Sequence, residues 1–233
     1  MINKGKILLF PCPISEGKIE SLSTEAVRML HDTTSFVVER AKTARHFIKA
    51  TQHPIPISSL EIIEITKDKR EWLPFLDRIH HGTDIGVISE AGCPGVADPG
   101  AEVVYWAHNH DIQVVPLVGP SSILMALMAS GMNGQNFAFN GYLSNKKPDL
   151  INQLKMLESK VQKTGQTQMF METPYRNGFM IDTILHALQG NTILCIACDI
   201  NGAEESIKTN TIASWKSIIG DNYHKKPCIF LLG

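Results

Sequence analysis

Four short segments rich in glycine, proline, serine and acidic residues carry the residue types that could bind a ligand. They span 10–17, 89–100, 118–122 and 171–176, and each follows a run of apolar residues. In the second segment, small residues let the backbone approach a bulky ligand, and prolines fix the shape of the loop. Because ligands of open α/β sheets bind beyond the carboxyl ends of the strands, the four segments together predict one ligand cleft.

The common nucleotide-binding loops are missing from these segments. The sequence has no GxxxxGK[S/T] loop, and no GxGxxG follows the first predicted strand. The ligand is therefore not expected to be a nucleoside triphosphate or a dinucleotide. The residues Gly-Pro-Ser-Ser at 119–122 fit the start of an anion-binding helix and a capped helix without a ligand equally well, so both remain open.

The cysteine and histidine patterns do not predict a metal site. Cys195 and Cys198 form a CxxC, but they lie in an apolar run that reads as a buried strand. Residues three apart in a strand point to opposite faces, so the two sulfurs would not share a metal ion. His108 and His110 lack a third ligand and are expected at the surface. Five scattered cysteines also argue against a disulfide framework.

Composition places the chain among ordinary soluble proteins. It has 233 residues, of which 43% are hydrophobic and 19% are charged, and its formal net charge is −1. The longest apolar run, 123–129, is far shorter than the ~20 residues of a membrane span, so a cytoplasmic protein without a membrane anchor is expected. The near-zero charge provides no global field for nucleic acid, so an RNA partner would need a local basic patch.

In the first half, short apolar runs alternate with amphipathic stretches, which predicts a mostly parallel sheet covered on both faces. Asp98 is expected to cap a helix that begins at Pro99, in preference to acting as a general base. The predicted strands are 6–10, 35–39, 85–89 and 112–117, and the predicted helices are 24–32, 71–81 and 100–110.

In the second half, strands follow one another more closely, which predicts a mixed sheet. The fold class is therefore α/β with two domains, 1–117 and 118–233. The predicted helices are 120–130, 148–163, 177–188 and 213–219, and the predicted strands are 137–143, 168–172, 192–199, 205–212 and 227–232.

Three of the four segments resemble motifs of one superfamily. Segment 89–100 reads S-E-A-G-C-P-G-V-A-D-P-G and is similar to S-D-A-G-T-P-x-x-S-D-P-G; Gly-Pro-Ser-Ser at 119–122 and Glu-Thr-Pro-Tyr-Arg at 172–176 follow in the same order. These motifs are typical of the tetrapyrrole methylases, the class III S-adenosyl-L-methionine (SAM)-dependent methyltransferases. Within that superfamily they are most similar to enzymes that 2′-O-methylate a cytidine of small-subunit rRNA. The resemblance implies a cofactor cleft between two α/β domains and a homodimer.

The resemblance also implies site residues. The cofactor contacts would be Pro11, Pro13, Ser89, Ala91, Gly92, Cys93, Val96, Ser121, Ser122 and Glu172. The family's P-T-P-I-G-N, E-D-T-R and R-E-L-T-K are replaced at 11–16, 39–42 and 198–202. Motifs on the cofactor side are thus kept better than those on the acceptor side, so methyl transfer is predicted more firmly than its acceptor.

Two sets of residues are candidates for handling an RNA acceptor. Glu39, at the end of a strand, could be a general base that activates a ribose hydroxyl, or it could pair with Arg40 or Lys42. Lys42, Arg45 and Lys49 have the i, i+3, i+7 spacing of one helical face, which suits phosphate binding as well as a solvated surface.

Two other functions remain open. A methylase of precorrins or uroporphyrins would act on a macrocycle, but those relatives favour a G-x-G-P-G-D first loop that segment 11–17 does not reproduce. A non-catalytic SAM-binding protein would also account for the altered acceptor motifs.

Overall fold

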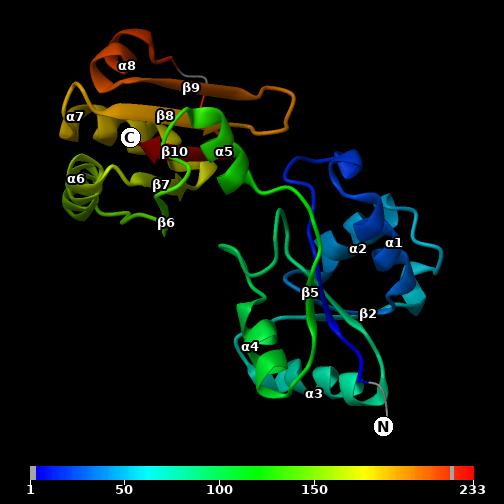
Figure 1. Cartoon of the computed structure of the whole chain (residues 1–233). Coiled ribbons are helices and arrows are strands. Elements are labelled where there is room, and N and C mark those ends of the chain that lie inside the picture. Colours follow the sequence, from blue (N-terminus) through cyan, green and yellow to red (C-terminus); the bar gives the residue numbers. More distant parts are fainter. Residues whose placement is uncertain (1–3, 221–222) are drawn as a thin grey trace. The chain divides into compact units, whose positions relative to one another are not determined.

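The computed structural model describes residues 4–220 and 223–233. The chain forms two compact units, Met1–Ser121 and Ser122–Gly233, each built around its own sheet (Figure 1). The division falls between Ser121 and Ser122, whereas the sequence placed it after residue 117. Within the described ranges, no helix combines the length and the apolar character needed to cross a membrane.

The first unit contains a five-stranded sheet in the order β3-β2-β4-β1-β5. All four pairings between neighbouring strands are parallel, which confirms the predicted α/β class. The edge strand β3 was not among the predicted strands; its apolar Ile62 and Ile63 are flanked by glutamates. The strands are β1 (Ile7–Phe10), β2 (Ser35–Val38), β3 (Glu61–Glu64), β4 (Ile85–Ile88) and β5 (Val114–Pro116).

Both faces of this sheet are covered. Successive residues of a strand point to opposite faces, so Ile7 lies in one buried cluster with Trp72, while Leu8 lies in another with Phe36. The helices of the unit are α1 (Thr24–Asp32), α2 (Ala41–Ala50), α3 (Leu73–Leu76) and α4 (Ala101–Asn109), with 3-10 helices η1 (Ile19–Ser21), η2 (Ile57–Ser59), η3 (Lys69–Glu71) and η4 (Asp77–His81).

The predicted helix 71–81 is wrong as a single element, because three short helices occupy it. Pro74 lacks an N–H and cannot continue the turn before it, so it lies in the first turn of a new helix, α3. The tighter η4 follows and ends at Gly82, whose left-handed φ of 89° stops the helix.

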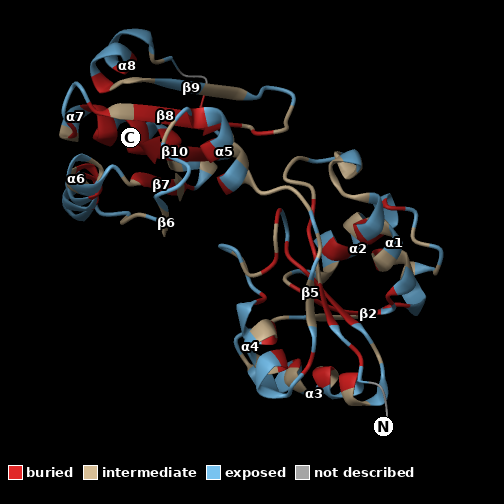
Figure 2. Cartoon of the chain, viewed as in Figure 1, coloured by how far each residue is buried: buried red, intermediate tan, exposed pale blue. Residues whose placement is uncertain are grey.

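The second unit contains a five-stranded sheet in the order β6-β7-β10-β8-β9. Only β6 and β7 pair in parallel, and the other three pairings are antiparallel, which confirms the predicted mixed sheet. Figure 2 shows that β8 and β10 are buried while the edge strand β9 is partly exposed. The strands are β6 (Phe137–Tyr142), β7 (Thr167–Glu172), β8 (Ile193–Cys198), β9 (Ser206–Thr211) and β10 (Cys228–Leu232).

The helices of the second unit pack against its sheet, and their buried apolar side chains form one large cluster with those of the strands. Leu154, Ile184 and Trp215, from three helices, pack with Phe230 of the central strand. The Trp215 indole also donates to the backbone oxygen of Leu194, at 2.8 Å, which satisfies its buried N–H. The helices are α5 (Ser122–Ser130), α6 (Lys147–Thr164), η5 (Pro174–Arg176), α7 (Asn177–Ala187) and α8 (Ile212–Ile218).

Candidate functional site

The loops that follow β1 and β4 are joined by a short backbone bridge. The N–H of Cys12 donates to the oxygen of Gly92 at 2.7 Å, and the N–H of Gly92 donates to the oxygen of Cys12 at 3.1 Å. The Cys12 thiol lies 3.2 Å from the backbone oxygen of Ser89. Burial raises the pKa of Cys12, so this cysteine is a neutral packing group and not a thiolate.

The loop after β5 packs against the same bridge. A Cβ atom on Gly119 would lie only 2.2 Å from the ring of Pro11, so this close approach requires glycine. The Cys93 thiol also contacts the backbone oxygen of Pro120 at 3.5 Å. Three of the four predicted segments therefore converge at the carboxyl ends of neighbouring strands within the first unit, where open α/β sheets bind ligands.

The segment 92–100 is a compact loop with an unusual backbone. Gly92, Gly95, Ala97 and Gly100 all have positive φ, which for Ala97 costs about 1 kcal/mol of backbone strain. The loop closes on itself through a 3.1 Å hydrogen bond from the N–H of Gly95 to the oxygen of Pro99. Its surface consequently offers mostly backbone groups and small side chains to a ligand.

The predicted helix cap at Asp98 is wrong. The helix α4 begins at Ala101, and its N-cap is Gly100, which has no side chain to cap it. Gly100 turns the chain with a φ of 131°, so Asp98 and Pro99 remain in the preceding loop. The carboxyl group of Asp98 therefore belongs to the loop, where it forms a hydrogen bond with Ser89.

Three carboxylates gather beside this loop, from Glu39, Glu90 and Asp98. Loss of solvent on burial, followed by repulsion from Glu39 and Glu90, raises the pKa of Asp98 to about 6, although a hydrogen bond with Ser89 acts in the opposite direction. A carboxyl group with such a pKa changes its charge close to neutral pH.

The contacts of Glu39 differ from the predicted ion pair with Arg40 or Lys42. One carboxylate oxygen of Glu39 accepts the backbone N–H of Glu90 at 3.0 Å. Arg40 instead approaches the carboxylate of Glu90, at 3.7 Å. Glu39 thus links the end of β2 to the start of the segment 89–100. Glu90 lies in this predicted segment, but it was not among the predicted site residues.

The basic residues predicted to share a helical face do so. Lys42, Arg45 and Lys49 are exposed on α2, while Ala44 and Ile48 form its buried face. Because these positions recur every three or four residues, the three cations form one solvent-facing stripe.

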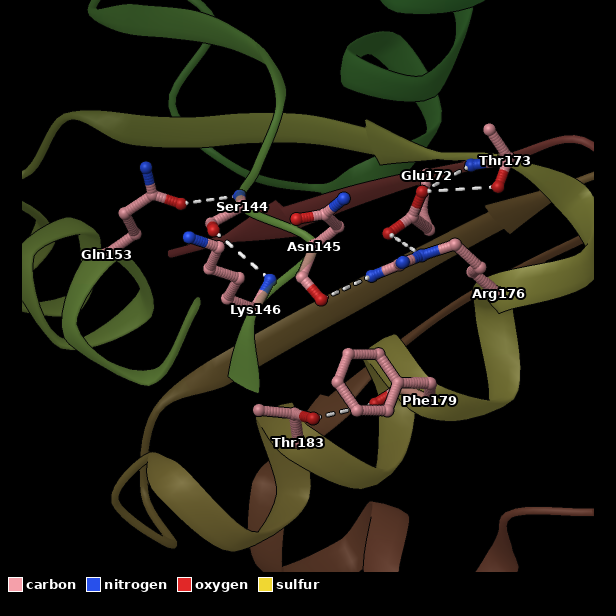
Figure 3. A network of polar contacts seen from close by, with 9 residues as sticks. All are labelled: Ser144, Asn145, Lys146, Gln153, Glu172, Thr173, Arg176, Phe179 and Thr183. Atoms are coloured by element: carbon pink, nitrogen blue, oxygen red, sulfur yellow. Dashed lines mark hydrogen bonds and ion pairs between the residues drawn. The ribbon is translucent and has the colours of Figure 1, made fainter. Parts of the chain in front are cut away.

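The fourth predicted segment belongs to the second unit and is held by a buried carboxylate (Figure 3). One oxygen of Glu172 accepts from the Arg176 Nε at 3.0 Å, and the other accepts from the backbone N–H of Thr173 at 2.7 Å. Arg176 also donates to the backbone oxygen of Asn145 at 3.4 Å. Partners within the turn thus occupy both oxygens of Glu172, which fixes the shape of the turn.

The CxxC cysteines lie on opposite faces of β8, as the strand geometry predicts. Cys198 is paired across the sheet with Cys228, and the hydrogen bond between the two thiols lowers the pKa of Cys198 and raises that of Cys228. Cys195 contacts Thr209 of β9 instead. In the described ranges, no group of three or more His, Cys, Asp and Glu residues is placed to hold a metal ion.

The fold is shared with methyltransferases of tetrapyrrole biosynthesis. Cobalt precorrin-4 methyltransferase CbiF matches with a TM-score of 0.63 and 13% identity, covering 98% of this chain and 94% of that one. The uroporphyrin-III-C-methyltransferase of Thermus thermophilus matches with a TM-score of 0.56 and 14% identity, covering 98% and 92%. No family model matches the sequence. These structural matches establish that the chain has the methyltransferase fold of those enzymes.

Sequence comparison places the chain more narrowly. The ribosomal RNA small subunit methyltransferase I of Mesomycoplasma conjunctivae is 30% identical over 190 residues, which are 81% of this chain and 74% of that protein. The Pseudomonas aeruginosa protein of the same name is 26% identical over 233 residues, covering 99% and 79%. The chain belongs to the ribosomal RNA small subunit methyltransferase I family and is a SAM-dependent methyltransferase.

Proposed function

We propose that this chain transfers a methyl group from SAM to a ribose 2′-hydroxyl of small-subunit rRNA, at a cytidine. The observation that carries the proposal is the joining of three strand-end loops through Cys12, Gly92 and Gly119 in a member of this family. The proposed setting is a homodimer in the cytoplasm that acts on the ribosomal subunit.

The residues of the first unit fit SAM. The small-residue loop exposes Ala91 and Val96 and presents backbone groups that can approach an adenosine closely. Nearby carboxylates suit a positively charged sulfonium. The proposed contacts are Pro11, Pro13, Ser89, Ala91, Gly92, Cys93 and Val96, with Ser121, Ser122 and Glu172.

When bound, SAM supplies a methyl group on a good leaving group. The chain must therefore align the acceptor in a dry site, and alignment of this kind is worth roughly 7–11 kcal/mol. Glu39 is the proposed base: it would accept the hydroxyl proton as the ribose oxygen bonds to the methyl carbon and the carbon–sulfur electron pair leaves with sulfur. A positioned base contributes about 10²–10⁴-fold.

Asp98 is a second candidate for the base because it lies in the same cluster. Its pKa of about 6 leaves it ionised at pH 7.5 and still able to accept a proton, which suits a general base. The proposed phosphate contacts are Lys42, Arg45 and Lys49, which form the exposed stripe of α2.

The test is transfer of labelled methyl groups from SAM to small ribosomal subunits isolated from cells that lack the enzyme. We expect one methyl group per subunit, released as 2′-O-methylcytidine after nuclease digestion. Subunits that already carry the modification are the matched control. Transfer to uroporphyrinogen or a precorrin, with none to the subunits, would instead support the macrocycle function that the structural neighbours share.

A further inference from the structure

Tyr175 is an exposed aromatic residue on a rigid turn of the second unit. Its side chain is 73% exposed, although it lies in η5 between a buried carboxylate and a packed helix. The backbone N–H of Arg176 donates to Thr173, at 2.9 Å, and the Arg176 side chain is tied to Glu172, at 3.0 Å. The turn therefore holds an apolar ring in solvent without gaining local burial from it.

Two basic residues adjoin this ring. The ring of His224 lies edge-on to that of Tyr175, with centroids 6.4 Å apart. The Lys225 Nζ lies 6.0 Å from the tyrosine centroid, and the backbone N–H of Lys225 donates to Pro174 at 3.1 Å. This hydrogen bond joins the two segments, so the ring and its cation are held together before any partner binds.

Two further lysines follow a residue that is hydrogen-bonded to the same turn. Arg176 donates to the backbone oxygen of Asn145, which precedes the exposed Lys146 and Lys147 (Figure 3). Lys226 is different, because it forms an ion pair with Glu204 at 2.8 Å. Among the residues that the structure describes, none forms an ion pair with Lys225, Lys146 or Lys147, and all three lysines are exposed.

We propose that Tyr175, His224 and Lys225 form a stacking platform for an unpaired nucleotide of the RNA substrate. The ring would stack on one base, and Lys225 and His224 would contact the adjoining phosphate. This inference rests on the proposed rRNA acceptor and adds a binding surface in the second unit to the basic stripe of α2.

The chemistry of the platform favours single-stranded RNA over other partners. A base must be unstacked from its neighbours before an aromatic side chain can lie on it, so the site selects loops and single strands over duplex. A protein partner would be expected to cover an apolar patch, whereas the neighbours of the Tyr175 ring are the Lys225 ammonium and the His224 ring.

The test measures binding of a fluorescent single-stranded RNA to the full chain by anisotropy. Because one base–aromatic stack is worth about 1–3 kcal/mol, Tyr175→Leu should weaken binding at least about fivefold, whereas Tyr175→Phe should retain most of it. Tyr105→Leu is the matched control, because Tyr105 is 71% exposed on α4 of the other unit. Lys225→Gln should weaken binding and reduce its salt dependence, and Lys160→Gln on α6 should not.

Methyl transfer to ribosomal subunits separates this inference from the function on which it rests. We expect Tyr175→Leu to raise KM for subunits and to leave the SAM affinity and melting temperature unchanged. If wild type methylates subunits and Tyr175→Leu matches it in KM and RNA affinity, the platform is wrong and the proposed function stands. A raised KM with unchanged affinity for free RNA would also overturn the platform, because it would indicate a protein contact. If wild type binds no RNA and methylates no subunits, both fail.

Discussion

Cys12 and Gly92 exchange two backbone hydrogen bonds, of 2.7 and 3.1 Å, although eighty residues separate them in the sequence. This bridge makes the loops after β1 and β4 a single structural feature. Gly119 then packs on Pro11 from the third loop. A shift of any one of these loops is therefore expected to move the other two, and so to change the contacts that each loop makes with a bound ligand.

Gly119→Ala should disrupt the proposed SAM site. The added methyl group would overlap the Pro11 ring. Such overpacking shifts the backbone and typically destabilises the folded state by about 1–3 kcal/mol. We expect the SAM affinity measured by calorimetry to fall at least about tenfold. Gly134→Ala is the control, since no atom lies within 4 Å of its added methyl group. Equal SAM affinity in the two variants would contradict the proposed site.

Glu39→Gln should slow methyl transfer while SAM still binds. Loss of a positioned base lowers the rate by about 10²–10⁴-fold, whereas the amide oxygen can still accept the N–H of Glu90. Single-turnover rates on ribosomal subunits measure the effect, and Asp98→Asn is the companion variant. A normal rate in Glu39→Gln with a large loss in Asp98→Asn would assign the base to Asp98.

Asp98→Asn should stabilise the protein at neutral pH. The pKa of Asp98 is raised to about 6 in the folded state, so the folded state binds this proton more tightly than the unfolded state. The resulting stabilisation is fully present below about pH 4 and is lost as the pH rises through about 6. With solvent screening of this half-exposed group taken into account, we expect the variant to gain about 1 kcal/mol at pH 7.5 and nothing at pH 4. Chemical denaturation at both pH values measures this, and a gain that does not depend on pH would contradict it.

Arg176→Ala should destabilise the second unit by about 2 kcal/mol, because it leaves the buried Glu172 carboxylate without its cation. Arg176→Lys should recover only part of the loss, since an ammonium group lacks the fork that reaches both Glu172 and Asn145. Arg28→Ala is the control. Its ion pair with Asp32 is exposed and should be worth less than about 0.5 kcal/mol. Similar urea midpoints for Arg176→Ala and Arg28→Ala would argue against a structural role for Glu172.

Reversing the charges of Lys42, Arg45 and Lys49 to Glu should weaken RNA binding at low salt. If all three contact phosphates, the slope of log affinity against log salt should fall by about 2 in magnitude. Reversal of Lys155, Lys160 and Lys163 on α6 changes the net charge equally and is the control. Equal losses in both variants would indicate a general charge effect and would remove the α2 stripe from the proposed interface.

The sequence alone determined the class of the protein and the positions of most of its helices and strands. The runs in β8 and β10 are almost wholly apolar because both faces of those strands are buried, and this pattern is visible in any local window. The predicted helix 24–32 matches the observed α1 because its apolar residues repeat at helical spacing; the structure adds that Ser23 caps it by accepting the N–H of Ala26. The loop motif at 89–100 likewise identified the superfamily without any structural information.

Tertiary structure decided how the site is assembled. The edge strand β3 is short and flanked by glutamates, so only its pairing with β2 identifies it as a strand. Asp98 does not cap α4, because Gly100 turns the chain and is itself the N-cap residue. The hydrogen-bond partner of Glu39 is a backbone N–H from a different loop. Such contacts join residues far apart in the chain. Their geometry depends on how whole strands pack, which local hydrophobic periodicity does not encode.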